Sequence, residues 1–393
     1  MATSCSWSIL IRMTFVIWAS GVFLTFTLLL HLISALVAAY RCRPEAKLCR
    51  PTPVGSDISI VRPLCGLDHG IEQTLRSTFS TQTDADIVFC VASPNDNVIP
   101  LVRRLIAEHP RRNARLLIGD NRISVNPKLN NMYKGWVETT TRWVIFADSN
   151  VLMPPDYLER LFGAWKADTG LVCAPPIGCE PDGFWAEVEC ATLNTYQARW
   201  QYFADAVGYG FAQGKSMLWR RDHLEQGGGI DALAREVAED AASTKVIRAA
   251  GLRVRLVNAP FGQPLGRRTA AEVWKRQVRW AQLRRASFPA QFAPEILSNG
   301  FAPLVAAAVF GLASDTSVIG MLLLTAAIYY GAEMVMAAAC GWHLSWRTPL
   351  TALARDLATP FLYVQGWRDT GFSWRGNAMR VDGPERPATA LSD

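Results

Sequence analysis

Residues 143–150 have the sequence Trp143-Val144-Ile145-Phe146-Ala147-Asp148-Ser149-Asn150, in which five apolar residues are followed by an acid and two small polar residues. A short continuous apolar run of this kind is typical of a strand that is buried on both faces of a sheet. Open α/β sheets bind their ligands at the carboxyl ends of such strands. The stretch therefore predicts an α/β fold with Asp148 at the binding edge.

Other short apolar runs alternate with helical stretches on both sides of this strand. The pattern predicts a largely parallel sheet, covered by helices on both faces, between about residues 56 and 290. No GxGxxG sequence follows the first strand, so a standard dinucleotide-binding fold is not expected. The expected strands before residue 143 are 58–61, 87–91 and 115–118, and the expected helices between them are 71–79 and 98–109.

The chain is apolar for a soluble enzyme, with 50% hydrophobic and 19% charged residues among 393. From Met13 to Tyr40 the only titratable side chains are His31 and Tyr40, and the run is long enough to span ~30 Å of hydrocarbon. A secretory signal would have a shorter apolar region. Basic residues gather after this run rather than before it, which predicts that the start lies outside and the rest faces the cytosol.

The last quarter of the sequence is apolar again. Residues 296–313 and 317–341 are each long enough to cross a membrane, although Glu333 would need a partner there. A third stretch, 349–367, is interpreted as a span rather than as an interfacial helix, although it contains two charged residues. The expected organisation is an anchor at 1–42, a cytosolic domain at 43–290, membrane or interfacial helices at 291–380 and a flexible tail at 381–393.

Cysteine usage and net charge indicate the compartment and the kind of partner. The nine cysteines are scattered and include no CxxC pair, which predicts free thiols in a reducing compartment. The net charge of +6 is not accompanied by a lysine-rich tract or an RNA-binding motif, so nucleic acid is not an expected partner. Arginines beside an anionic membrane surface account for the charge.

Two clusters of polar residues carry candidate chemistry. Asp96, Asp148 and the pair Glu239-Asp240 stand where strands end or helices begin, positions that capping and turn residues also occupy. In Arg276-Gln277-Val278-Arg279-Trp280 the two arginines share one face of an expected helix, and guanidinium groups match phosphate oxygens. An amphipathic helix lying on lipid headgroups is the alternative for this second cluster.

Together these clusters resemble, in order and spacing, the D, D, D, (Q/R)xxRW signature of inverting glycosyltransferases with a GT-A fold. Within that group the chain resembles a bacterial-type member of the ceramide glucosyltransferase family, over about residues 55 to 380. The resemblance implies a UDP-sugar donor, a membrane lipid acceptor, and a site facing the cytosol, with a bacterial inner membrane favoured. The further motifs that carry it are Asn126-Pro127-Lys128-Leu129-Asn130-Asn131, Gly227-Gly228-Gly229, Ala238-Glu239-Asp240 and Phe372-Ser373-Trp374-Arg375.

The resemblance also implies a role for each matching residue. Asp240 is expected to be the general base, tuned by the charge of Glu239. Asp148, supported by Asn150, is expected to bind a divalent cation, magnesium or manganese. The residues expected to bind the substrates are Arg62 and Asp96 at the base and ribose, Lys128 near the diphosphate, and Arg276, Arg279 and Trp280 on the diphosphate and acceptor side.

Two departures from animal members leave the substrates open. The first acidic motif keeps one carboxylate, Asp96, and Gln197 stands where animal members have a histidine. UDP-glucose is favoured over a galactose, glucuronate or N-acetylglucosamine donor, and ceramide over diacylglycerol or a hopanoid. Too few helices follow the domain for a processive polysaccharide synthase. A scaffold that binds sugar nucleotides without turnover would lack Asp240 or the arginine-tryptophan motif, and both are present.

Overall fold

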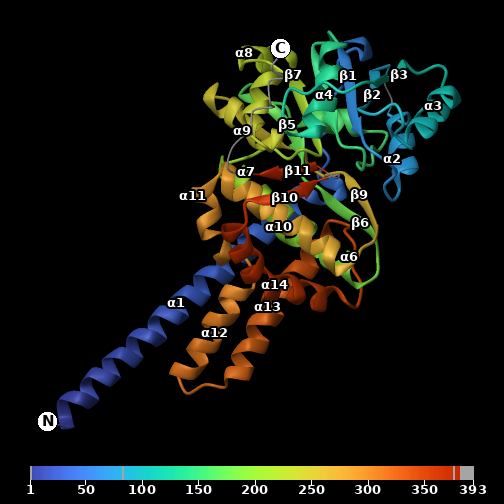
Figure 1. Cartoon of the computed structure of the whole chain (residues 1–393). Coiled ribbons are helices and arrows are strands. Elements are labelled where there is room, and N and C mark those ends of the chain that lie inside the picture. Colours follow the sequence, from blue (N-terminus) through green and yellow to red (C-terminus); the bar gives the residue numbers. More distant parts are fainter. Residues whose placement is uncertain (1, 82–83, 375–376, 381–393) are drawn as a thin grey trace.

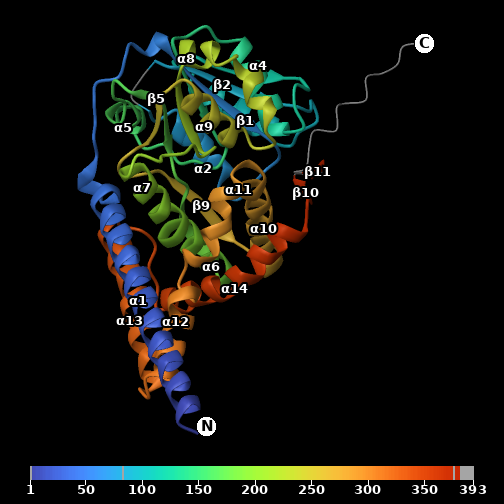
Figure 2. The same ribbon diagram turned by 90° about the vertical axis from the view of Figure 1, so that its left-hand side faces the viewer.

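The computed structural model describes residues 2–81, 84–374 and 377–380. A sheet domain lies at one end of the molecule, and three helices, α1 (Ala2–Cys42), α12 (Phe301–Ala313) and α13 (Val318–Ala339), project together from the other end (Figure 1). A rotated view shows α1 running beside α12 and α13 as far as the domain (Figure 2).

Seven strands form the central sheet in the order β3-β2-β1-β4-β7-β5-β8. Its pairs are parallel except at β7, which is antiparallel to both of its neighbours. The largely parallel sheet predicted from the sequence is therefore confirmed, with one inverted strand. The strands are β1 (Ile58–Leu64), β2 (Asp86–Val91), β3 (Ala114–Ile118), β4 (Trp143–Ala147), β5 (Thr169–Ala174), β7 (Ser216–Arg220) and β8 (Arg253–Leu256).

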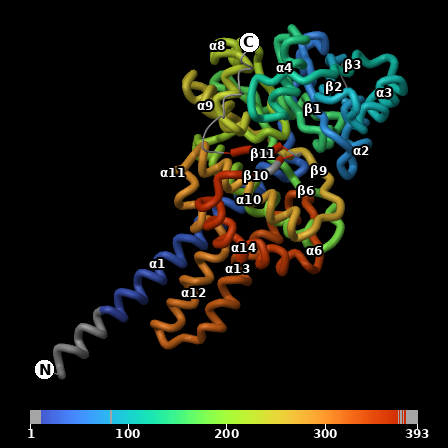
Figure 3. Tube along the Cα trace, viewed as in Figure 1, coloured from blue at the N-terminus to red at the C-terminus, as the bar shows by residue number. Residues whose placement is uncertain are grey.

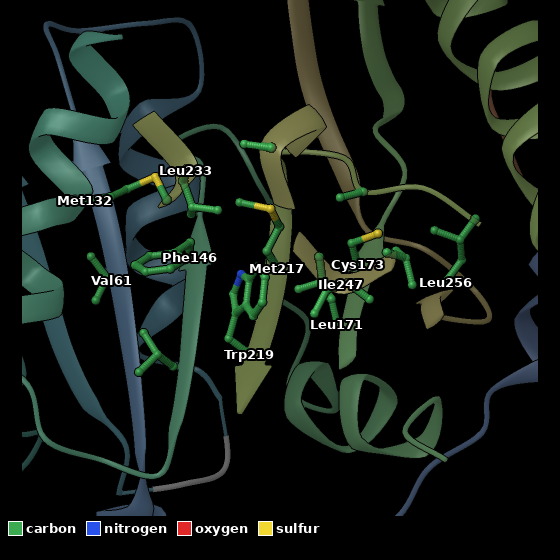
Figure 4. Close-up of a cluster of buried hydrophobic side chains, with 14 of the residues drawn as sticks. Val61, Met132, Phe146, Leu171, Cys173, Met217, Trp219, Leu233, Ile247 and Leu256 are labelled. Atoms are coloured by element: carbon green, nitrogen blue, oxygen red, sulfur yellow. The ribbon is translucent and has the colours of Figure 1, made fainter. Parts of the chain in front are cut away.

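Helices cover both faces of this sheet. Alternate side chains of each strand point to opposite faces, so that Val61 and Phe146 pack on one side while Ile60 and Ile145 pack on the other. Figure 4 shows the first of these clusters, with Phe146 beside Met132. The helices are α2 (Ile71–Thr78), α3 (Ile99–Glu108), α4 (Pro127–Val137), α5 (Tyr157–Gly163), α8 (Arg221–Gln226) and α9 (Glu239–Ala249).

A second layer lies between the sheet and the projecting helices (Figure 3). It contains the parallel pair β6 (Ile177–Asp182) and β9 (Gly262–Arg267), and a π-helical segment, 192–198, that joins α6 (Phe184–Ala191) to α7 (Arg199–Ala206). The remaining elements of this part of the chain are α10 (Ala270–Ser287), α11 (Pro289–Phe292), α14 (Thr348–Arg368), and the hairpin of β10 (Gly371–Trp374) and β11 (Asn377–Arg380).

Within the part of the chain that the structure describes, two helices are long and apolar enough to cross a membrane, namely Arg12–Cys42 of α1 and α13. The expected span at 296–313 is broken: α12 has 13 residues and is bent by 44° from the segment Pro289–Leu297, so the two together make at most a third span. The preference for a span at 349–367 is not supported. Helix α14 is not among the candidate spans of the described residues, and it contains the charged residues Arg355 and Asp356.

Cys42, Cys49, Cys90, Cys173, Cys179, Cys190 and Cys340 form no disulfide bond. Cys42, Cys90, Cys173, Cys190 and Cys340 are buried, where they pack as small apolar groups. The expected flexible tail at 381–393 and Arg375 of the last motif lie outside the described residues.

Candidate active site

Arg62 fixes the position of the loop that follows β4. This side chain on β1 is completely buried, and its guanidinium donates to the backbone carbonyls of Asp148 (2.7 Å), Ser149 (3.0 Å) and Val151 (3.1 Å). Burial lowers the pKa of Arg62 to about 10, so it stays charged at neutral pH. The two terminal nitrogens of Arg62 therefore donate inside the protein, where they position the Asp148 loop, and a contact of Arg62 with the nucleotide stays a prediction.

Asp96 joins the loops that follow β1 and β2. Its carboxylate accepts hydrogen bonds from the backbone amides of Gly66 (3.0 Å) and Val98 (2.9 Å), and the residue is half-buried. Nearby, Asn131 on α4 donates to the carbonyl of Leu64 at the end of β1 (3.2 Å). Asp96 therefore lies at the carboxyl edge of the sheet, where the sequence analysis expected it.

Lys128 links two acidic residues from distant parts of the chain. The side chain of Asn126 caps α4 by accepting from the backbone amides of Lys128 and Leu129, which fixes where Lys128 stands. The ammonium then pairs with Asp148 (2.6 Å) and Glu239 (2.5 Å) and donates to the carbonyl of Gly214 (2.5 Å). Lys128 therefore holds Asp148 of the β4 loop against the start of α9.

Asp240 lies next to this ion-pair cluster at the start of α9. Its carboxylate accepts from the backbone amides of Gly214 (3.2 Å) and Ala241 (2.8 Å), and the residue is half-buried. Burial and then the charge of Glu239 raise the pKa of Asp240 to about 6, against the opposing effect of Lys128. Glu239 is itself held by Asn126, at 2.7 Å, and by Lys128.

Lys215 completes the cluster, and it was not predicted from the sequence. Its ammonium donates to the carboxylate of Asp148 (2.8 Å) and to the side-chain oxygen of Asn150 (3.2 Å). The strand pairing brings it there, because β7 runs antiparallel to β4 with Ser216 opposite Ala147. A lysine directly before an apolar strand indicates a charged group at a sheet edge. The sequence does not reveal, however, which strand pairs with β4.

Gly214 lets the side chains of Glu239 and Lys128 lie close to its backbone. A Cβ atom at this position would lie 2.7 Å from a carboxylate oxygen of Glu239 and 2.8 Å from the ammonium of Lys128. Both neighbours are ends of side chains, so a larger residue would displace the cluster rather than the backbone.

The arginine-tryptophan motif lies on α10. Arg276 pairs with the fully buried Glu189 (2.5 Å) and contributes to the electrostatics of Lys215. The guanidinium of Arg279 lies over the ring of Trp374, 5.6 Å from its centre. Trp280 is half-buried and packs on the cluster formed by Cys190, Leu193 and Leu265. The motif thus brings Arg276 near the cluster and joins α10 to the β10–β11 hairpin.

The expected divalent cation requires free carboxylate oxygens at Asp148. Burial alone would raise the pKa of Asp148, but the ammonium groups of Lys128 and then Lys215 hold it at about 2. Both carboxylate oxygens are engaged by these lysines. In the described residues there is no group of three or more His, Cys, Asp or Glu side chains that could hold a metal ion. The donor set at Asp148 therefore does not fit the expected cation.

The structure thus brings three of the expected site residues, Lys128, Asp148 and Glu239, into direct contact. Asp240 lies beside them and is linked to Lys128 through the backbone of Gly214. Carboxylates and cations at the carboxyl edge of a mixed α/β sheet, with an arginine-tryptophan helix below it, define a GT-A-like glycosyltransferase. Residues 26–386 match glycosyl transferase family 21, and the chain belongs to that family. The family resemblance predicted from the motifs is confirmed.

Curated relatives carry the same family name as the motifs suggested. Ceramide glucosyltransferase 1 of Caenorhabditis elegans is 27% identical over 271 residues, 68% of this chain and 58% of that protein. Ceramide glucosyltransferase 3 of the same organism is 23% identical over 90% of this chain and 78% of that protein. Among solved structures, a mannosyltransferase from Pyrobaculum calidifontis in complex with GDP-Man and Mn2+ is 17% identical and has a TM-score of 0.48, covering 86% of this chain and 99% of that one.

Proposed function

We propose that the protein transfers glucose from UDP-glucose to the primary hydroxyl of ceramide, with inversion at the anomeric carbon. Membership of family 21 and the relatives named ceramide glucosyltransferase support this reaction. The observation that carries the proposal is the position of Asp240, a half-buried carboxyl group with a pKa of about 6 beside the Lys128–Asp148 ion pair.

Asp240 is the general base in this proposal. A base works best when its pKa lies near the operating pH, because it is then both ionised and able to hold a proton. Asp240 takes the proton of the lipid hydroxyl, whose oxygen forms a bond to the anomeric carbon while the bond to the diphosphate breaks. A single displacement of this kind inverts the configuration.

The departing diphosphate gains negative charge, which positive groups must stabilise. The candidate groups are Lys215, at the carboxyl edge of the sheet, and Arg276 of α10, whose charge acts on Lys215. Lys128 has a different role in this proposal. It holds Asp148 and Glu239 in place, and in doing so it sets the environment of Asp240.

A membrane lipid acceptor is supported by an apolar pocket near the motif helix. The pocket lies between α6, the π-helical segment, α10 and α14, and both Gln197 and Gln277 line it. These two side chains contact one another (3.4 Å), which places the pocket next to the arginine-tryptophan motif. Its apolar wall includes Trp185, Val188, Val273, Trp274, Phe292 and Leu362. In the proposed arrangement the sheet domain faces the cytosol and a lipid chain enters this pocket.

The acceptor and donor are tested by incubating the purified full chain with labelled UDP-sugars and a panel of lipids. We expect glucosylceramide from UDP-glucose and ceramide, and at least 100-fold less product with Asp240→Asn. Product on diacylglycerol or a hopanoid alone would overturn the ceramide assignment and leave the transferase class intact. Product from UDP-galactose, UDP-glucuronate or UDP-N-acetylglucosamine alone would overturn the donor assignment in the same way.

A further inference from the structure

A metal-assisted nucleotide site needs oxygen ligands that are free to bind the ion. Magnesium is usually held by one or two carboxylates together with phosphate oxygens of the substrate. Asp148 is the carboxylate directly after β4, so its two oxygens decide whether an ion fits there.

Both oxygens of Asp148 face ammonium groups. Lys128 lies 2.6 Å from one and Lys215 lies 2.8 Å from the other, and Lys215 also occupies the side-chain oxygen of Asn150 at 3.2 Å. The carboxylate is thus charge-balanced by cations of the protein itself. A dication placed at either oxygen would have to displace an ammonium and would be repelled by the one that remained.

The two lysines differ in how many donors they have left. An ammonium group has three N–H donors. Those of Lys128 are matched by Asp148, Glu239 and the carbonyl of Gly214. Lys215 has two acceptors among the described residues, Asp148 and Asn150, and 17% of its side chain is exposed. Its third donor is available to a ligand.

Lys215 is also held in place by the sheet. Its backbone carbonyl accepts from the amide of Asp148 (2.9 Å), and Ser216 is paired with Ala147 across β4 and β7. The ammonium and the carboxylate therefore start from adjacent, fixed backbone positions. An ammonium at a fixed position is a strong partner for phosphate oxygens, as a point charge and as a donor.

We infer that the ammonium of Lys215 takes the place of the divalent cation at the diphosphate end of the donor site, so that this enzyme binds and uses its nucleotide donor without a metal. The inference rests on the proposed function, since it assumes that the ligand is a nucleoside diphosphate sugar. When the anomeric C–O bond breaks, the electron pair stays on the diphosphate oxygen and Lys215 stabilises the added charge. The proton of the acceptor goes to Asp240.

The test is the affinity of the purified full-length protein for UDP, measured by calorimetry in excess EDTA and again with Mn2+ or Mg2+. We expect the wild-type Kd to change less than about threefold between these conditions. Lys215→Met should weaken UDP binding in EDTA by about tenfold or more, since a charge-assisted hydrogen bond is lost. Lys215→Arg should recover part of the affinity, because the positive charge and donors return.

Lys166→Met is the matched control, because Lys166 is an exposed lysine outside the cluster, and its affinity should equal that of the wild type. Thermal unfolding of each variant checks that the fold is intact. Turnover of the wild-type enzyme should also persist in EDTA.

UDP binding that is lost in EDTA and restored by Mn2+ would overturn this inference while leaving the proposed function in place. An affinity of Lys215→Met equal to that of the wild type in EDTA would overturn it as well. Absence of UDP binding in every condition would overturn the proposed function together with the inference.

Discussion

The carboxyl group of Asp240 titrates within the range of ordinary enzyme assays. Because the proposed base must be ionised, kcat/KM is expected to fall as the pH drops through about 6. The fold should not weaken in the same window. A carboxyl group whose pKa is raised in the folded state binds its proton more tightly there, so its own contribution to stability grows as the pH falls through about 6. A pH profile of kcat/KM, with thermal unfolding measured in parallel, checks this prediction.

Glu239→Gln supplies the control for that profile. Removing the neighbouring negative charge should move the acid limb to lower pH, since Glu239 is the second largest cause of the raised pKa of Asp240. An acid limb that stays in place, or moves to higher pH, would contradict the assignment of Asp240 as the titrating group.

Gly214 allows a second prediction for a single residue. In Gly214→Ala the new methyl group meets the ends of Glu239 and Lys128, which can shift without moving the backbone. We therefore expect turnover to fall about tenfold or more, because a small misplacement of catalytic groups is costly, while the melting temperature changes little. Gly331→Ala is the matched control, because a Cβ there meets no atom within 4 Å. Wild-type turnover in Gly214→Ala would argue against a functional cluster at this position.

Individual elements show what the sequence could and could not predict. Strand β4 and the position of Asp148 followed from one continuous apolar run. Lys215 could not be placed, because it is 67 residues from Asp148 and reaches it only through the antiparallel pairing of β7. The direction of the Arg62 side chain could not be predicted for a related reason: its position on β1 was expected, but its guanidinium donates to the loop after β4, 86 residues later in the sequence.

Helix α14 gives a prediction at the scale of elements. Arg355 forms buried ion pairs with Glu333 of α13 (3.0 Å) and with Asp356 (2.8 Å), and donates to Thr195 of the π-helical segment (2.7 Å). The partner that Glu333 was expected to need is thus found. Arg355→Met would leave two buried carboxylates without their cation, at a cost of about 3–5 kcal/mol. We expect a large loss of thermal stability.

The matched control is Arg368→Met, because Arg368 is an exposed arginine at the end of the same helix. A triple variant, Arg355→Met with Glu333→Gln and Asp356→Asn, should regain part of the lost stability, since no buried charge is then left unpaired. Equal melting temperatures for Arg355→Met and Arg368→Met would contradict a role of this network in joining the membrane helices to the domain.

For the whole molecule, the arrangement of α1, α12 and α13 predicts a topology. The candidate span of α1 has 31 residues, about 46 Å, which exceeds the hydrocarbon core. Near its end, Ala35, Ala38 and Cys42 are buried in a cluster that also includes residues of α7, α13 and the sheet. We therefore predict that the domain sits directly on the membrane surface, on the side that we propose to be cytosolic.

Labelling of single cysteines tests this orientation. In a background with Cys5, Cys49 and Cys65 replaced by serine, Thr316→Cys in the loop between α12 and α13 should react with a membrane-impermeant thiol reagent in intact cells. A protein that retains Cys49 alone of these three should react only after permeabilisation, because Cys49 is exposed on the domain side of α1. The reverse pattern would contradict the proposed orientation.

The cluster around Asp240 and Asp148 is proposed to carry out an inverting transfer to a lipid hydroxyl. The most direct measurement is the anomeric configuration of the lipid product made from α-linked UDP-glucose and ceramide, determined by proton NMR, for the wild type and Asp240→Asn side by side. We predict a β-linked product from the wild type and at least 100-fold less from the variant. An α-linked product, or an undiminished yield with Asp240→Asn, would contradict the account.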